Sequence, residues 1–293
     1  MLALGAACAP LLAGPLPDIA SVPADLEVPP LSGGPPAAGK RVKQVLPAKG
    51  GTAVHHVLYL PADWTPDAAR KFPVLVEFAG NGPYRNKHGD VSSGKVEGSK
   101  LGYGISGGRG FIWLCLPYLD NAGGANVTQW WGEKPEYDPG PTVAYCRAAV
   151  PWVCEHYGGD PQRIVLCGFS RGAIACNFIG LHDDTIAKLW SAFIPYSHYD
   201  GVNTGWPYPG SDREAALARL KRLGNRPQFI CSEGTGADAT RSYLESTGVT
   251  GRWTFRTTGF RNHNDAWVLR PSPARNELRA WLKAHLERAA AAR

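Results

Sequence analysis

The stretch that decides the fold prediction is Arg163-Ile164-Val165-Leu166-Cys167-Gly168-Phe169-Ser170-Arg171-Gly172-Ala173-Ile174. Its beginning is almost continuously apolar, as expected for a strand buried on both faces of a parallel sheet. The residues from Ala173 onward are typical of a helix, and Gly168-Phe169-Ser170-Arg171-Gly172 stands between the two. A strand, a G-x-S-x-G motif and a helix, in that order, form the context of a nucleophile elbow. We therefore predict that Ser170 is a nucleophile on a tight strand-to-helix turn.

The two glycines of this motif have a steric explanation. Gly168 and Gly172 lack the side chains that would clash with neighbouring backbone in a strained turn. The helix that begins at Arg171 points its free N–H groups and the positive end of its dipole toward Ser170. The backbone N–H of Arg171 is therefore the first candidate donor of an oxyanion hole.

Strand-like and helix-like segments alternate over most of the chain. Apolar runs of strand length lie at 54–60, 72–78, 111–116, 163–168, 190–195, 228–231 and 253–257. Helical patterns lie at 142–156, 171–181, 212–223, 239–247 and 273–290. Such alternation predicts a three-layer α/β domain with a mostly parallel central sheet and helices on both faces. We place this catalytic domain at residues 40–293.

Residues 1–39 differ from the rest of the chain in composition. The stretch Met1–Ala13 is apolar and too short to span a bilayer as a helix, and we interpret it as the remnant of an export signal. Cys8 weakly resembles a lipoprotein cleavage site. Residues 10–36 are rich in Pro, Gly and Ala, which indicates an extended linker or a segment lying along the surface. We expect a periplasmic or extracellular protein, with a lipid anchor and a cytoplasmic location left open.

Composition and charge argue against several functional classes. The formal net charge is +6, but Lys and Arg are scattered, which is typical of solvated surfaces and disfavours a nucleic-acid partner. No C-x-x-C pair occurs, so a zinc or redox site is disfavoured, and we predict no metal and no cofactor. Apart from Cys8, an even number of cysteines remains, so an exported protein could form one disulfide, which the sequence does not assign.

From about Phe72 to the C-terminus the chain resembles the α/β-hydrolase superfamily. Gly159-Asp160-Pro161-Gln162-Arg163-Ile164, leading into the G-x-S-x-G motif, is similar to secreted esterases related to feruloyl esterases, acetylxylan esterases and polyhydroxyalkanoate depolymerases. The resemblance implies a serine hydrolase whose triad runs in the order serine, acid, histidine along the chain. It does not extend to the substrate.

This order selects His263 as the general base. His263 follows the last apolar strand and lies in a loop before the final helix, from which its imidazole can reach Ser170. The other histidines precede Ser170, follow it too early or lie on the terminal helix, namely His55, His56, His88, His156, His182, His198 and His285.

The acid is expected in the loop 232–238, after the strand 228–231. Asp238 best fits the pattern that the superfamily implies, and it would hold the tautomer of His263. The alternative role for Asp238 is an N-cap of the helix that begins near Ala239. Glu233 and Asp200 are the other candidates for the acid.

The second oxyanion donor is expected in the glycine-containing loop after the strand 72–78. Asn81 and Gly82 are the candidates, because Pro83 has no N–H, and an ordinary turn is the alternative. This loop opens the long segment 81–110, which lacks periodicity. A loop of such length is more often functional than idle.

Four aromatic residues lie on loops that we expect near the site, namely Tyr84, Trp130, Trp131 and Trp206. They could stack on a sugar or an aryl acyl group, or they could brace Pro-rich loops. The sequence thus predicts a serine esterase that forms an acyl-enzyme on a carbohydrate-linked, aryl or polyester substrate, with no membrane span. A peptidase or amidase on the same fold is one alternative. A non-catalytic carbohydrate-binding protein on a degenerate hydrolase fold is the other.

Overall fold

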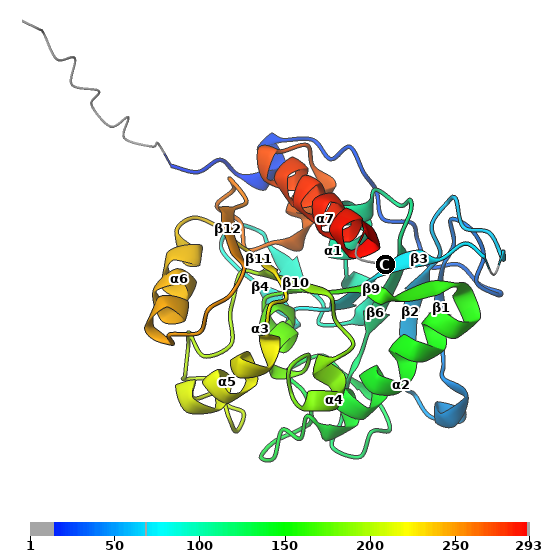
Figure 1. Ribbon diagram of the computed structural model, residues 1–293, viewed down its shortest axis with the longest axis horizontal. Coiled ribbons are helices and arrows are strands. Elements are labelled where there is room, and N and C mark those ends of the chain that lie inside the picture. Colours follow the sequence, from blue (N-terminus) through cyan, green and yellow to red (C-terminus); the bar gives the residue numbers. More distant parts are fainter. Residues whose placement is uncertain (1–14, 68, 292–293) are drawn as a thin grey trace, which may run out of the picture.

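The computed structural model describes residues 15–67 and 69–291, with side chains described up to residue 289. Its centre is an eight-stranded sheet in the order β1-β2-β6-β3-β9-β10-β11-β12 (Figure 1). The strands of this sheet are β1 (Arg41–Gln44), β2 (His56–Tyr59), β3 (Phe72–Phe78), β6 (Ile112–Leu116), β9 (Gly159–Phe169), β10 (Ala192–Tyr196), β11 (Gln228–Ser232) and β12 (Trp253–Thr257). Two short hairpins, β4 (Tyr84–Arg85) with β5 (Val91–Ser92) and β7 (Tyr118–Leu119) with β8 (Asn126–Val127), lie outside it.

The sheet is mostly parallel, as the sequence predicted. From β6 through β3, β9, β10 and β11 to β12 every neighbouring pair is parallel, and only β2 runs antiparallel to both of its neighbours. The carboxyl ends of the parallel strands therefore meet at one edge, where open α/β sheets bind their ligands.

Helices cover both faces of the sheet and complete three layers (Figure 1). They are α1 (Leu101–Ser106), α2 (Gly140–Tyr157), α3 (Arg171–Phe178), α4 (Asp184–Ala187), α5 (Arg213–Leu220), α6 (Gly236–Ser246) and α7 (Pro273–Ala291). Successive side chains of a strand point to opposite faces, so Val76 packs with the cluster under α2 and α3, whereas Leu75 packs with the cluster under α1 and α7. The predicted three-layer α/β architecture is confirmed.

The structure adds elements that the sequence pattern did not reveal. The strand β1 is a short edge strand, and the aperiodic segment 81–110 contains the β4–β5 hairpin and the helix α1. Short 3-10 helices complete the elements of the described residues, at Ile19–Ser21, Pro47–Lys49, Val96–Gly98, Lys221–Leu223 and Asp265–Leu269.

Residues 15–39 lie along the surface of the domain, beside α7 in Figure 1. The Ile19 N–H donates to Oδ1 of Asn262 at 2.7 Å, and Asp18 pairs with Arg261 at 2.7 Å. Asp25 forms a further ion pair with Arg275. Of the two expectations for this stretch, a segment tied to the surface is the one observed. The expected export signal and Cys8 lie outside the described residues.

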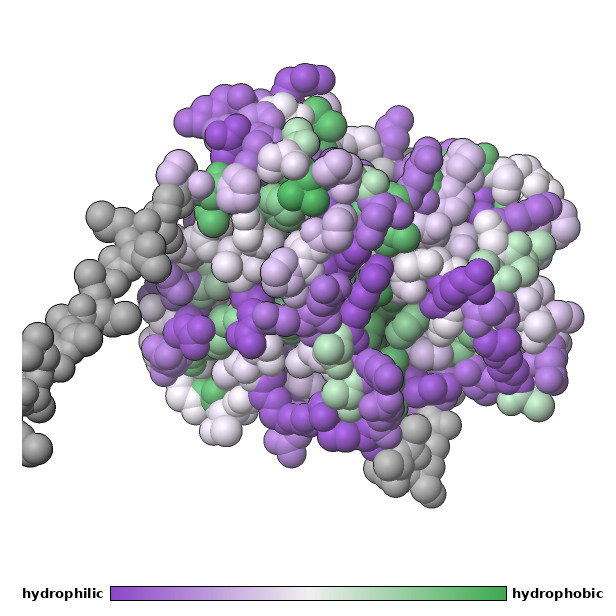
Figure 2. All heavy atoms as spheres, turned by 90° about the horizontal axis from the view of Figure 1, so that it is seen from above, coloured by the Kyte–Doolittle hydropathy of each residue, from purple (hydrophilic) through white to green (hydrophobic). Residues whose placement is uncertain are grey.

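Seen from above, on the side of α7, the surface is largely hydrophilic, with apolar residues visible in separate places (Figure 2). The cysteines of the described chain are buried and free, so the single disulfide that the sequence left open is not formed there; they are Cys115, Cys146, Cys154, Cys167, Cys176 and Cys231. Among the described residues, no helix is long and apolar enough to cross a membrane.

Candidate active site

Ser170 lies at the turn between β9 and α3, in backbone geometry that few residues adopt. Its φ of 54° and ψ of −114° fall outside the usual regions for an L-residue. A Cβ on Gly172 would lie 1.9 Å from the carbonyl oxygen of Phe78, and one on Gly168 would lie 2.2 Å from the backbone of Gly172. Both glycines are therefore required for steric reasons, and the predicted strand, turn and helix are all present.

Ser170, His263 and Glu233 form a continuous hydrogen-bonded chain. Nε2 of His263 lies 3.1 Å from Oγ of Ser170, and Nδ1 lies 2.7 Å from Oε1 of Glu233. A carboxylate can only accept, so Nδ1 carries the imidazole proton and Nε2 is left to accept from the serine hydroxyl. This is the arrangement that activates a serine for nucleophilic attack.

The carboxylate in this chain corrects the sequence-based choice of Asp238. Asp238 is exposed in the first turn of α6, which begins at Gly236 rather than near Ala239. Asp200 is also ruled out, because its two oxygens accept from Arg219 at 2.8 and 3.0 Å. Glu233, one of the alternatives, directly follows β11 and so stands at the strand end that faces His263.

The environment of Glu233 favours its ionised form. Burial raises the pKa of this carboxyl, but the hydrogen bond and the charge of His263 oppose burial and the net shift is downward. The Ser197 hydroxyl adds a further hydrogen bond to Oε1, at 3.0 Å. Glu233 is therefore a carboxylate that can hold an imidazolium.

Asp90 fixes the loop that carries His263, and sequence reasoning did not find it. The buried carboxylate accepts from the His263 backbone N–H at 3.0 Å through Oδ2. Its Oδ1 accepts from the side-chain amides of Asn262 and Asn264 at 2.9 and 3.2 Å. Asp90 belongs to the β4–β5 hairpin, so the long segment 81–110 contributes a residue that holds the loop of His263.

The two candidate residues for the second oxyanion donor have different surroundings. The Gly82 N–H donates to the Thr128 carbonyl at 2.9 Å, so Gly82 is engaged elsewhere and the expectation for it was wrong. The side chain of Asn81 accepts from the Trp130 N–H at 2.8 Å, which fixes the loop and leaves the Asn81 backbone N–H as the candidate. The Arg171 N–H is at the first position of α3, where helix N–H groups have no intrahelical acceptor.

The side chain of Arg171 ties the loops around Ser170 together. Its buried guanidinium donates to the carbonyls of Trp130, Gly80 and Gly94 at 2.6, 2.9 and 3.1 Å. It also stacks on the Tyr118 ring, 3.7 Å from the centroid. Burial lowers the pKa of Arg171 to about 10, so the group stays charged at neutral pH. The loop that carries Asn81 is thus anchored to the residue that follows the nucleophile.

Three of the four predicted substrate-binding aromatics lie toward the site. The Tyr84 ring packs edge-on against His263 with centroids 5.5 Å apart, and it is 38% exposed. The half-buried rings of Trp130 and Trp206 are 5.0 Å apart, and His198 joins Trp206 to His263 at 5.6 and 5.3 Å. Burial lowers the pKa of His198 to about 4, so its side chain is uncharged at neutral pH. We call Tyr84, Trp130, Trp206 and His198 the aromatic wall.

Trp131 was wrongly expected among the substrate-binding residues. It is fully buried and stacks on Phe178 with centroids 4.2 Å apart, as part of the core. The neighbouring Trp130 has a φ of 48°, so the chain turns sharply here and the two indoles take different directions. Two adjacent tryptophans on a loop carry no sequence signal of this difference.

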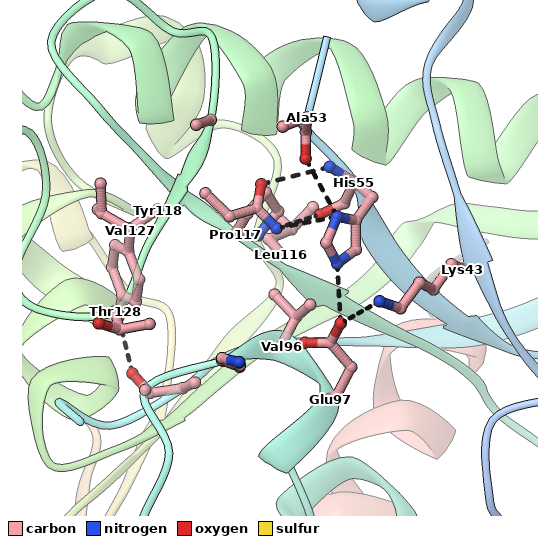
Figure 3. Close-up of a pocket in the computed structure, with 15 residues that line it drawn as sticks. Lys43, Ala53, His55, Val96, Glu97, Leu116, Pro117, Tyr118, Val127 and Thr128 are labelled. Atoms are coloured by element: carbon pink, nitrogen blue, oxygen red, sulfur yellow. Dashed lines mark hydrogen bonds and ion pairs between the residues drawn. The ribbon is translucent and has the colours of Figure 1, made fainter. Parts of the chain in front are cut away.

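A separate cavity of about 270 Å³ is lined by residues of several segments, among them His55, Val96 and Leu116 (Figure 3). Its polar end contains Glu97, which pairs with Lys43 at 2.7 Å and with His55 at 2.9 Å, and its wall includes Tyr118 and Val127. Neither Ser170 nor His263 lines it. The described residues also contain no group of three or more His, Cys, Asp or Glu side chains that could hold a metal ion.

Comparisons with solved structures agree with the α/β-hydrolase fold. An S-formylglutathione hydrolase from Agrobacterium tumefaciens aligns at a TM-score of 0.53 and 14% identity, over 85% of this chain and 94% of that chain. The fluorophosphonate-binding serine hydrolase F of Staphylococcus aureus aligns at a TM-score of 0.52 and 12% identity, over 86% of this chain and 99% of that chain. The chain therefore has the α/β-hydrolase fold over most of its length.

Other neighbours are longer proteins. The AtxE2 isopeptidase aligns at a TM-score of 0.51 and 15% identity, over 85% of this chain but only 40% of that chain. The chain spans 62% of the length of a thermostable esterase, at a TM-score of 0.48. No protein-family model matches the sequence, and no curated protein matches it in the comparison with curated proteins. At these identities the likeness establishes the fold and leaves the substrate open.

Proposed function

We propose that this protein is a serine hydrolase that cleaves carboxylic esters through an acyl-enzyme. The observation that carries the proposal is the chain from Ser170 Oγ to His263 Nε2 at 3.1 Å and from His263 Nδ1 to Glu233 at 2.7 Å. The three residues follow β9, β12 and β11, and so meet at the carboxyl edge of the sheet. Nucleophile, base and orienting acid are then held by a rigid scaffold.

The proposed reaction begins when Ser170 Oγ attacks the ester carbonyl and its proton passes to Nε2 of His263. The backbone N–H groups of Arg171 and Asn81 would donate to the oxyanion of the tetrahedral intermediate. As the intermediate collapses, the ester C–O bond breaks, His263 returns the proton to the leaving alkoxide and the acyl-enzyme remains. Water then attacks with His263 as base again, and the carboxylic acid leaves Ser170 free.

An uncharged ring-bearing substrate suits the aromatic wall beside His263. Trp130, Trp206 and Tyr84 offer partly exposed faces or edges on which an aryl group or a sugar can stack. The neutral His198 lies in the same wall. We therefore propose carbohydrate-linked, aryl or polyester esters as the substrate class, in line with the resemblance to secreted esterases. Export of the protein also remains a proposal, tested by determining the N-terminus of the mature chain.

The decisive experiment compares wild type with Ser170→Ala on a short aryl ester. We expect the variant to lose hydrolysis and labelling by a fluorophosphonate while its circular dichroism and melting temperature stay unchanged. Retained hydrolysis in a folded Ser170→Ala protein would refute the proposal. A panel of acetyl, feruloyl and polyester substrates then identifies the acyl group.

A peptidase or amidase is the second candidate, because an isopeptidase shares the fold over most of this chain. Peptide and anilide substrates with acyl groups matched to the esters separate the two. Higher kcat/KM on the amides would replace the esterase proposal. The non-catalytic alternative requires that Ser170 not react with the fluorophosphonate while a glycan binds measurably.

A further inference from the structure

Ser197 makes hydrogen bonds to both partners of the acid–base pair. It immediately follows β10, the strand between those that lead to Ser170 and to Glu233. Its Oγ lies 3.0 Å from Oε1 of Glu233 and 2.8 Å from Nδ1 of His263. With the 2.7 Å contact between Glu233 and His263, the three polar atoms form a nearly equilateral triangle.

The backbone of Ser197 is held in a conformation that serine rarely adopts. Its φ is 88°, in the region that favours glycine, where a side chain costs conformational energy. The Ser197 N–H donates to the Cys231 carbonyl at 2.8 Å, and the Tyr196 carbonyl accepts from the Ser170 N–H at 3.0 Å. The strained residue is therefore fixed between the strand ends that carry the nucleophile and the acid. A glycine would fit this backbone without strain, yet the chain has a hydroxyl here.

Glu233 lacks the support that its second oxygen would be expected to have. Oε2 is buried and has no hydrogen-bond partner among the described residues, whereas Oε1 receives both Ser197 and His263. Without the Ser197 hydroxyl, the imidazole would be the one remaining side-chain hydrogen-bond partner of this carboxylate within the described chain. Rotation of the carboxylate would then move the acceptor away from Nδ1.

We propose that Ser197 is a positioning residue that fixes the Glu233 carboxylate and, through it, the tautomer and orientation of His263. This inference rests on the proposed hydrolase function. Ser197 touches no reacting atom. It contacts both Nδ1 of His263 and Oε1 of Glu233, and the hydrogen bond that its hydroxyl donates is the one to Glu233. The Ser197 hydroxyl donates a hydrogen bond to Oε1 of Glu233, and Nδ1–H of His263 points toward the same two oxygens. The two residues together restrict the orientation of the imidazole.

Two substitutions separate the hydroxyl from the backbone strain. Ser197→Ala removes the hydroxyl and keeps the strained Cβ, whereas Ser197→Gly removes both. We expect both variants to lose roughly tenfold to a hundredfold in kcat on an aryl ester with little change in KM, the size expected for a hydrogen bond to a charged group. The melting temperature of Ser197→Gly should equal or exceed that of wild type. Activity that followed stability from one variant to the other would overturn the inference.

A double-mutant cycle with Glu233→Gln tests the route of the effect. If Ser197 acts through the Glu233 carboxylate, Ser197→Gly should change kcat by less than about twofold in the Glu233→Gln background. An undiminished loss in that background would overturn the inference. Wild-type activity in both Ser197→Ala and Ser197→Gly would overturn this inference alone and leave the hydrolase proposal standing. Absence of both hydrolysis and fluorophosphonate labelling in wild type would overturn the two together.

Discussion

Oε1 of Glu233 lies 2.7 Å from Nδ1 of His263, while Asp238 is exposed in the first turn of α6. Glu233→Gln should therefore lower kcat about 10³- to 10⁴-fold, because the amide no longer selects the tautomer that leaves Nε2 free. Asp238→Asn is the matched control and should keep kcat within about twofold, since substitutions on the open surface rarely matter. Steady-state kinetics on an aryl ester measure both. Equal losses in the two variants would contradict the assignment of the acid.

Arg171→Lys should damage stability and activity together. A lysine ammonium has three donors on a flexible stem and cannot replace a planar guanidinium that spans several carbonyls. We expect a loss of at least about 2 kcal/mol in unfolding free energy. We also expect a lower kcat, because the loop that carries Asn81 is no longer held by the Arg171 guanidinium. Urea unfolding of the variant and of the exposed control Arg241→Lys provides the comparison. A stable, fully active Arg171→Lys protein would show that the hydrogen bonds of the Arg171 guanidinium to the loop carbonyls are not needed for stability or activity.

Asp90→Asn should impair catalysis through the loop that carries His263. The substitution replaces a carboxylate oxygen with an NH₂ group that faces the donors of Asn262, His263 or Asn264. A shift of the loop by about 1 Å is enough to lower kcat roughly a hundredfold. Asp212→Asn, at the N-cap of α5, is a suitable control because Asn caps helices as well as Asp does. Unchanged kcat in Asp90→Asn would mean that the loop holds its position by other means.

The neighbouring indoles allow a test of the aromatic wall. Trp206→Ala should raise KM for an aryl ester roughly threefold to tenfold, the effect of losing an aromatic contact of about 0.5–1.5 kcal/mol, with little change for a short alkyl ester. Trp131→Ala should instead cost roughly 3–5 kcal/mol of stability, because it empties a core position. Thermal unfolding and KM values for the two esters report the two effects. Equal KM changes for both esters would remove Trp206 from the substrate site.

His56 should make the protein sensitive to acid. It is fully buried in β2, and burial, with a smaller contribution from His55, lowers its pKa from 6.5 to about 3. Below pH 6.5 the unfolded chain binds a proton that the folded chain refuses, so stability is lost as pH falls from 6.5 toward 3. At pH 4.5 the loss should be about 3 kcal/mol relative to neutral pH. Urea unfolding of wild type and His56→Gln across this range measures it, and equal slopes would contradict the prediction.

The sequence determined the parts of the site that depend on local pattern and chain order. The apolar run into Ser170 and the two flanking glycines predicted the elbow, and a Cβ at either glycine would indeed clash with backbone. Chain order placed His263 after the last strand. Both predictions depend on the order of residues along the chain.

Residues that meet only in three dimensions were harder to predict. Choosing between Glu233 and Asp238 depends on where α6 begins, and helix boundaries read from sequence are uncertain by a few residues. Asp90 and Ser197 lie far from His263 along the chain, and their residue types are common in ordinary turns. The Trp131 and Trp130 side chains take different directions because Trp130 has a positive φ, which no periodicity predicts.

The charge of Arg171 has an electrostatic consequence beyond its contacts. Within the described chain its guanidinium pairs with carbonyl dipoles and a ring, and with no carboxylate, so its positive potential is not cancelled locally. The source of that potential is the residue next to Ser170, and the guanidinium contacts the loop that carries Asn81. The protein scaffold thereby favours negative charge at this point before any substrate arrives, and water has less reorganisation to supply during the reaction. Inhibitors that gain a negative charge at this point, such as boronic acids that form a tetrahedral adduct with Ser170, should therefore bind more tightly than analogues that stay neutral.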